Sequence, residues 1–482
     1  MCDGSSDTRV GEVTYAETPD RTLLFLMASI EASVRMRSKT SDAVRAYLNA
    51  PSLDKNLVVI ADKDMTEGTG MERFERESLL LKGLYGSIKG ALSFQVWVES
   101  KLQEINYHKC SIARGVYMKE EHQGDIVRLL RHSDDFLLSA NSVEKVDSEV
   151  SILRDKIRTT PFKEVDEFLG CQFKRYRSDD MVEDTAGDII LVTMVGKIEK
   201  LDKDYGYLKK RFNPTGRVRY TPLPLKPIPD EDELGTEQKE LLSPEDIKIF
   251  MSLTMSIGWI VGNVRPNLKF PHHVIAKKLA TPRVWDMYLA VWIMEHLLLT
   301  KEWPLILGGP TVDPEVEIES SFGTMDQRRT VGSHCLVTGR KSGVIYANVQ
   351  TYKVTVKSIF EGEALAASEG QDTSIYARRV VEELKYPSKD SRKVLVDNMP
   401  AIDWMLGSVP TKRSKHMEVR LYRSRHLVDE GEVMMEYIPT EENMADLLTK
   451  SLPRTRYEKL AKRMLGHELV PLEFQFWIQQ EV

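Results

Sequence analysis

The sequence has little cysteine and no long apolar run. Its 482 residues include four cysteines, Cys2, Cys110, Cys171 and Cys335, which lie far apart without metal-ligand spacing. This excludes a disulfide scaffold and favours a reducing, intracellular location, cytoplasmic or nuclear. The apolar runs are far shorter than the roughly 20 residues that span a bilayer, so we expect no membrane partner. Residues 1–20 lack an apolar core, and we expect neither a signal nor a transit peptide.

The chain also lacks an excess of positive charge. Lys and Arg total 67 against 73 Asp and Glu, a formal net charge of −6. A protein that coats nucleic acid through bulk charge is therefore excluded, and any such contact needs local basic clusters. Hydrophobic residues make up 41 %, which excludes a wholly disordered chain, and the length suggests about three domains.

Apolar periodicity predicts a mixed α/β fold. A Pro-rich acidic stretch, residues 221–246, is the clearest linker, and Gly308-Gly309-Pro310 marks a second boundary. We expect helices over residues 21–36, 75–106, 142–158, 244–262, 283–299, 361–385, 440–449 and 454–465. Strands are expected over residues 42–48, 56–61, 334–337, 344–348 and 393–396, a hairpin over 126–140, and a strand followed by a helix over 188–212.

An acidic pair interrupts the hairpin. Asp134 and Asp135 stand between two apolar strands, where Asn-Gly or Asp-Gly is the usual turn. Adjacent strand residues point in different directions, so one or both carboxylates could hold a divalent cation. A plain solvated turn is the alternative interpretation, because exposed carboxylates are common.

Other motifs accompany this pair. In chain order the matching segments are 42–49 (DAVRAYLN), 84–89 (LYGSIK), 132–135 (HSDD), 168–170 (FLG), 221–224 (TPLP), 256–258 (SIG) and 265–267 (RPN). Together they resemble the reverse transcriptase of copia-type LTR retrotransposons. The resemblance implies a right-hand polymerase with palm, fingers and thumb.

The resemblance also implies roles for particular residues. Asp42 and Asp134 would hold two Mg²⁺ ions, with Asp135 assisting and Mn²⁺ as a substitute. Tyr47 would lie under the sugar and exclude a 2′-hydroxyl, and its alternative is a core aromatic. Gly86 and Lys89 would line the incoming nucleotide and template; the alternative is a solvated lysine beside a turn glycine.

A second acidic set follows residue 310. Residues 437–450 (YIPTEENMADLLTK) closely match a motif of the RNase H domain that follows the polymerase in the same family. By this resemblance four carboxylates would hold two Mg²⁺ ions for hydrolysis of RNA in RNA–DNA hybrids: Glu319, Glu363, Asp397 and Asp446. Each alone could be an ordinary surface carboxylate.

Two basic clusters could contact a duplex through its phosphates. A solvated basic face is the alternative. The candidate residues are Lys209, Lys210, Arg211, Arg217 and Arg219 in the first cluster and Lys412, Arg413 and Lys415 in the second.

These features predict three parts: a reverse transcriptase over residues 1–222, an acidic linker with a helical connection over 223–309, and an RNase H-like domain over 310–482. The expected partners are an RNA template, a DNA primer, RNA–DNA hybrid and dNTPs, with a ribonucleoprotein or protein assembly as a further partner. Two departures favour an alternative. In the family a basic segment of the fingers precedes the motif that matches residues 15–18, and this sequence does not include it, so we expect an N-terminally truncated chain. In addition, Glu319 stands where the family has an Asp. The alternative is a domesticated, weakly active or inactive remnant that binds RNA or a ribonucleoprotein.

Overall fold

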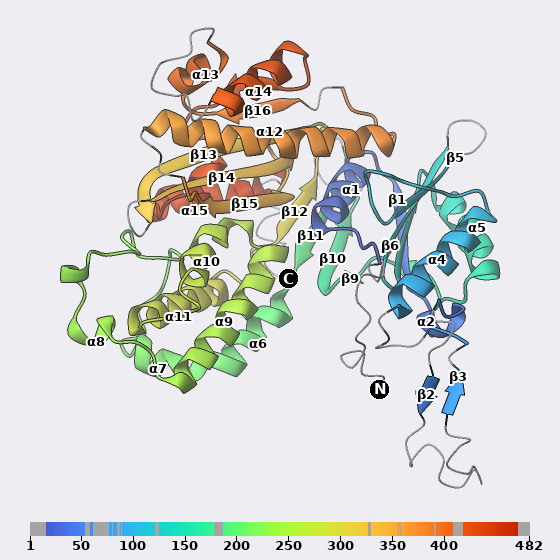
Figure 1. The fold of residues 1–482 in the computed structure, drawn as a ribbon, viewed down its shortest axis with the longest axis horizontal. Coiled ribbons are helices and arrows are strands. Elements are labelled where there is room, and N and C mark those ends of the chain that lie inside the picture. Colours follow the sequence, from blue (N-terminus) through green and yellow to red (C-terminus); the bar gives the residue numbers. More distant parts are fainter. Residues whose placement is uncertain are drawn as a thin grey trace. The chain divides into compact units, whose positions relative to one another are not determined.

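The computed structural model describes residues 16–53, 58–60, 77–79, 81–83, 87, 89–120, 125–177, 187–325, 329–354, 356, 358–389, 392–407 and 418–470. The chain forms a mixed α/β structure with several sheets, as expected from the sequence (Figure 1). Its contacts divide it into two compact units. The first comprises residues 1–24 and 36–165, and the second residues 25–35 and 166–482; α1 (Arg21–Ser33) passes from one to the other.

The first unit is built on a six-stranded antiparallel sheet of order β4-β5-β6-β7-β1-β8. Its strands are β1 (Arg37–Asp42), β4 (His108–Lys109), β5 (Val116–Glu120), β6 (Ile126–His132), β7 (Asp135–Ala140) and β8 (Lys163–Glu164). The predicted hairpin over 126–140 is confirmed. The short strands β2 (Val58–Ile60) and β3 (Glu77–Leu79) pair separately.

Two helices cover one face of this sheet, α4 (Gly90–Gln103) and α5 (Val143–Lys156). Phe94 and Val98 of α4 share an apolar core with Leu129 and Leu138 of the sheet and with α5. Burial of this face holds the strands in register, because a slip of one residue would turn their apolar side chains outward.

The second unit begins with a four-stranded antiparallel sheet of order β12-β11-β10-β9 and a group of helices. The strands are β9 (Glu167–Phe168), β10 (Cys171–Tyr176), β11 (Ile189–Thr193) and β12 (Leu305–Gly308). The helices are α6 (Val195–Tyr205), α7 (Lys209–Phe212), α8 (Thr236–Lys239), α9 (Pro244–Asn263), α10 (Lys269–Ala276) and α11 (Val284–Leu299). The predicted helices over 244–262 and 283–299 are confirmed, and Ser243 caps α9 by accepting the Asp246 N–H.

The unit continues as a five-stranded mixed sheet of order β15-β14-β13-β16-β17, in which β13, β16 and β17 are parallel. Its strands are β13 (Pro314–Met325), β14 (Arg329–Thr338), β15 (Tyr346–Thr351), β16 (Lys393–Val396) and β17 (Met434–Tyr437). Around it lie α12 (Ile359–Glu383), α13 (Met399–Leu406), α14 (Glu418–Asp429), the 3₁₀ turn η9 (Met444–Leu448) and α15 (Arg454–Met464).

The long helix α12 lies across β13 and β14 (Figure 1). A Cβ on Gly370 would lie 2.5 Å from Ile318 Cγ2, and one on Gly362 would lie 2.7 Å from Ser320 Oγ. Glycine at these positions therefore lets the helix approach the strand closely and brings Glu363 beside it. Apolar side chains of η9 and α15 form a second cluster with residues of β14, including Cys335, and of β15.

Three sequence-based expectations are wrong in detail. The strand expected over 42–48 ends at Asp42, after which Arg45 adopts a left-handed φ of 54° and α2 (Ala46–Asn49) begins. In the described part of the helical zone expected over 75–106, the helix is α4 (Gly90–Gln103), whereas residues 77–79 form a strand that pairs with 58–60. The helix expected over 440–449 is only the turn η9. The three-part domain division remains a prediction.

Two further observations concern the cysteines and the helices. The side chains of Cys110, Cys171 and Cys335 are buried. Of the helices in the described ranges, none is long and apolar enough to cross a bilayer.

Candidate active sites

The first site lies at the β6–β7 turn of the first unit. Strand β6 ends at His132 and β7 starts at Asp135, so Ser133 and Asp134 form the turn, with Ser133 at φ 58°. Asp42, the last residue of β1, pairs in register with Asp135. Side chains directly opposite in an antiparallel pair share a face. The Ala43 N–H donates to the Asp134 carbonyl oxygen at 2.8 Å. The fold thus brings Asp42, Asp134 and Asp135 together.

The electrostatics agree with this proximity. Burial first, then the hydrogen bond to Asp42 and the charges of Asp42 and Asp134, raise the pKa of Asp135 to about 7. Like charges at one site disfavour full ionisation, and a bound cation would relieve this. A carboxylate-only donor set suits a hard divalent ion such as Mg²⁺.

Neighbouring side chains fix the turn. Arg131, which is 1 % exposed, donates to the Ser133 carbonyl oxygen at 3.1 Å and to the Glu17 carbonyl oxygen at 2.9 Å. The Tyr47 hydroxyl lies 3.3 Å from Ser133 Oγ, and its ring packs edge-on against Phe94. Tyr47 is half-buried, so it meets both the apolar core and the turn. Lys89 precedes α4 as its N-cap residue, and Gly86 lies outside the described residues.

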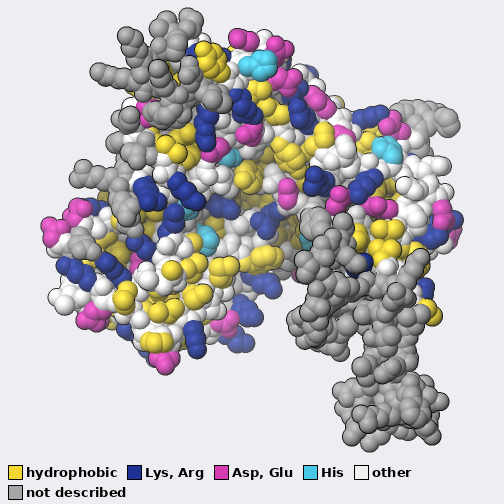
Figure 2. Space-filling view, in the orientation of Figure 1, with side chains coloured by type: hydrophobic (Ala, Val, Ile, Leu, Met, Phe, Trp, Pro, Cys, Tyr) yellow, Lys and Arg dark blue, Asp and Glu magenta, His cyan; other side chains and the backbone are white. Residues whose placement is uncertain are grey.

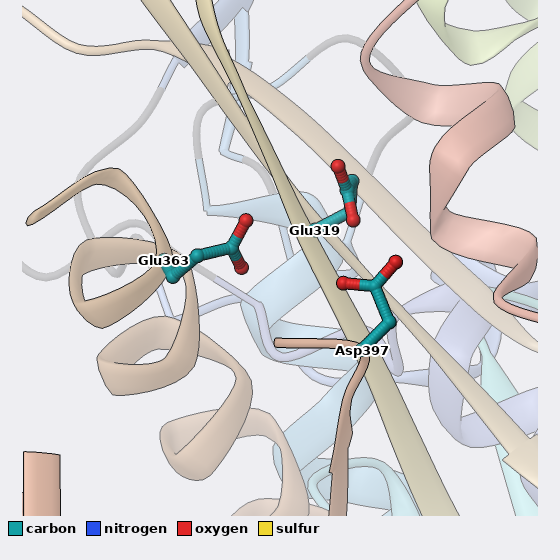
Figure 3. Close-up of side chains that lie close together, drawn as sticks. All are labelled: Glu319, Glu363 and Asp397. Atoms are coloured by element: carbon teal, nitrogen blue, oxygen red, sulfur yellow. The ribbon is translucent and has the colours of Figure 1, made fainter. Parts of the chain in front are cut away.

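The second site is assembled in the second unit from separate elements. Glu319 comes from β13, Glu363 from α12, and Asp397 directly follows β16. One oxygen of each carboxylate lies within 4.8 Å of the others, and the three side chains face one another (Figure 3). The extra methylene of Glu319, relative to the expected Asp, does not take its carboxylate out of the cluster.

Hydrogen bonds orient these carboxylates. Glu363 Oε1 accepts from the N–H and the Oγ of Ser320, at 3.2 and 3.1 Å. Asn443 donates to Glu319 Oε2 at 3.3 Å and to the Ile318 carbonyl oxygen at 2.9 Å. Among the described residues, the other oxygen of Glu363, Oε2, is buried and has no hydrogen-bond partner. A buried carboxylate oxygen that lacks a donor is a suitable cation ligand.

Burial and mutual repulsion raise two pKa values in this cluster. Burial, followed by the charge of Asp397, raises the pKa of Glu363 to about 8. Burial, followed by the charge of Glu363, also raises the pKa of Glu319. The cluster therefore carries less negative charge at neutral pH than three isolated acids would.

Asp446, the fourth predicted acid, has different neighbours. It lies on η9 with its side chain fully buried. Its Oδ1 is 2.5 Å from Lys450 Nζ, and its Oδ2 accepts from Arg456 of α15. Lys450 Nζ also lies 3.5 Å from Glu319 Oε1. The sequence motif does not by itself assign Lys450 and Arg456 to the site, although opposite charges at i and i+4, as in Asp446 and Lys450, indicate a pair.

The predicted basic residues are not equivalent. Arg219 is only 6 % exposed, pairs with Glu295 at 3.4 Å and lies 3.8 Å above the Trp292 ring, which favours a packing role. Lys209 pairs with Asp202 at 2.5 Å and Arg211 with Asp246 at 3.1 Å. Lys210 and Arg217 are exposed. Lys412, Arg413 and Lys415 lie outside the described residues.

On the face drawn in Figure 2, Lys and Arg side chains form separate groups among acidic ones. This distribution agrees with local rather than bulk positive charge.

The sequence is similar to that of a known protein. It is 24 % identical over 458 residues to the "Retrovirus-related Pol polyprotein from transposon TNT 1-94" of Nicotiana tabacum. The chain is thus similar in sequence to a retrotransposon Pol polyprotein. The match covers 93 % of the chain and 32 % of that polyprotein. The predicted resemblance to copia-type elements is confirmed, and the chain spans about a third of this curated relative.

Comparisons with family models and with solved structures give no close match. No protein-family model matches the chain. Among solved structures, a prototype foamy virus protease-reverse transcriptase is 11 % identical, with 91 % of this chain and 47 % of that chain covered and a TM-score of 0.20. Its native form is 10 % identical, with 96 % and 71 % covered and a TM-score of 0.22. Similarity at this level does not bear on the fold.

Proposed function

We propose that this retrotransposon Pol relative is an RNA-directed DNA polymerase with a linked RNase H activity. The observation that carries the proposal is the pairing of Asp42 with Asp135 in register, with Asp134 in the adjoining turn. Three carboxylates at one turn, within a chain related to Pol polyproteins, match the two-metal requirement of nucleotidyl transfer. In this proposal the six-stranded sheet is the palm, and the helices after β11 contribute the thumb and connection.

At the first site Asp42 and Asp134 would hold the Mg²⁺ ions, with Asp135 assisting. When bound, such ions stabilise the attacking and leaving oxygens of phosphoryl transfer. The protein's own part is to position the acids through the β1–β7 register and to anchor the turn through Arg131. Tyr47, held against Phe94 and the turn, would exclude the 2′-hydroxyl of a ribonucleotide.

At the second site Glu319, Glu363 and Asp397 would hold a divalent ion, and their carboxylate-only donor set and the unpartnered Glu363 Oε2 fit one. The ion would activate water for attack on the RNA phosphate. Ser320 and Asn443 keep Glu363 and Glu319 aimed at the cluster. The RNA template, DNA primer, hybrid and dNTPs are the partners that this proposal requires.

Primer extension tests the polymerase. Purified chain, Mg²⁺, dNTPs and a DNA primer on an RNA template should give extension. We expect Asp134→Asn to reduce it by on the order of 10³-fold. Asp155→Asn, a matched change at an exposed acid of α5, should have no effect. No extension by the wild type, or equal extension by Asp134→Asn, would reject the polymerase.

Hybrid cleavage tests the RNase H. A labelled RNA–DNA hybrid should be cut by the wild type and not by Glu363→Gln, which changes one of the three grouped acids. Binding of RNA or hybrid without either reaction would favour the alternative, an inactive remnant that serves as a nucleic-acid-binding protein.

A further inference from the structure

Lys450 contacts two of the four acids predicted for the second site. Its Nζ bridges Asp446 Oδ1 at 2.5 Å and Glu319 Oε1 at 3.5 Å, and its side chain is 34 % exposed. A lysine side chain is a charged ammonium group at neutral pH, and this one lies between two of the four acids.

Both oxygens of Asp446 already have cationic partners. Lys450 Nζ forms an ion pair with Oδ1, which accepts no hydrogen bond among the described residues, and Arg456 donates to Oδ2. The other three acids are grouped with one another, each with an oxygen within 4.8 Å of the rest. The four acids are therefore split into a trio facing one point and a single acid neutralised by the protein's own bases.

The charge balance agrees with this division. Two basic side chains and one divalent ion together neutralise four ionised carboxylates. A second divalent ion beside Asp446 would meet the Lys450 ammonium at short range in a partly buried site, where like charges repel strongly. It would bind only after Lys450 had moved away.

We infer that Lys450 is a resident cation that takes the place of a second divalent ion, so that this site holds a single metal ion in the absence of nucleic acid. The inference rests on the proposed RNase H function and departs from the two ions expected from the sequence. Lys450 is a positioning and specificity residue, because its ion pair with Asp446 leaves only Glu319, Glu363 and Asp397 as ligands for the metal ion.

Counting bound Mn²⁺ tests this without an activity assay. The full chain carries Asp42→Asn and Asp134→Asn to silence the first site, and calorimetry and electron paramagnetic resonance count the ions. We expect one ion in this background. Lys450→Met should bind a second ion, or bind its weaker ion at least about tenfold more tightly. Lys450→Arg, which keeps the charge, and Lys459→Met, at an exposed lysine of α15, should retain one ion.

The outcomes separate this inference from the proposed function. Two ions of equal affinity in the background and in Lys450→Met would overturn the inference and leave metal-dependent hydrolysis standing. If neither protein bound an ion, both would fall. A single ion that Glu363→Gln abolishes, with a second ion gained only in Lys450→Met, would support both.

Discussion

The two acidic sites are built in opposite ways. The first uses neighbouring strands and one turn, where Asp42 is exposed and Asp134 and Asp135 are half-buried. The second gathers side chains from β13, α12, η9 and the residue that follows β16. Three of its acids are nearly or fully buried: Glu319 is 5 % exposed, Glu363 2 % and Asp446 0 %.

Their charge environments differ too. The groups that act on Asp135 are carboxylates, whereas Lys450 and Arg456 contact Asp446. Water and dissolved ions screen the repulsion between carboxylates at an exposed site, whereas buried carboxylates need neighbouring cationic side chains or a bound ion. Metal binding at the second site should therefore depend more on the protein's own charges.

The largest expected effect separates the two chemistries. Asp397→Asn removes one of the three grouped carboxylates and should lower hybrid cleavage by on the order of 10³-fold while primer extension is unchanged. Asp429→Asn, at an exposed acid of α14, is the control. Loss of extension together with cleavage would show that the sites are not independent.

A change beside the first site should alter substrate choice. Tyr47→Val shortens the side chain that lies near Ser133, so ribonucleotide incorporation should rise by about 10- to 100-fold relative to dNTPs. The measurement compares extension with each nucleotide type, and Tyr207→Val, at an exposed tyrosine, is the control. An unchanged preference would assign Tyr47 to the core alone.

The pH dependence of metal binding should distinguish the sites further. A metal binds the ionised acid, and the pKa of Glu363 lies at about 8 because of burial and Asp397. Mn²⁺ affinity at the second site should therefore rise by roughly 25-fold between pH 6.5 and 8.5 and fall as protons return. Calorimetry in the Asp42→Asn Asp134→Asn background measures this. A flat profile would contradict the raised pKa.

The smallest effect concerns stability of the second unit. The Tyr457 hydroxyl of α15 lies 2.8 Å from His296 Nε2 of α11 and accepts from Asn267 Nδ2 at 2.9 Å. Tyr457→Phe removes a hydrogen-bond partner from His296 Nε2 and from Asn267 Nδ2, and it should lower the free energy of unfolding by about 1–2 kcal/mol. Denaturant unfolding beside Tyr437→Phe, at an exposed tyrosine, tests it. Equal stability of both variants would show that water or another group replaces the hydroxyl.

The sequence predicts those helices and strands that depend on the order of neighbouring residues. The apolar strands on either side of Asp134 and Asp135 specify the hairpin, and Ser142 caps α5 by accepting the Lys145 N–H. The end of β1 at Asp42 was missed, because it depends on where β7 begins. The helix expected around Asp446 was also wrong, since tertiary contacts with β13 and β14 shape η9.

The candidate sites show the same limit. The acidic residues of both sites could be predicted from the sequence, because each lies in a short motif and the motifs occur in the family's order. The split of four acids into a trio and Asp446 could not, since Arg456 reaches Asp446 from α15 and Lys450 also reaches Glu319 on a distant strand. Burial and pKa follow from those long-range contacts.

The central claim is that one chain holds two separate metal-dependent activities. Its most direct test assays primer extension and hybrid cleavage in the same preparations of wild type, Asp134→Asn and Asp397→Asn. The account predicts a crossover: Asp134→Asn loses extension and keeps cleavage, and Asp397→Asn does the reverse. Wild type without either reaction, or variants that lose neither or both, would contradict it.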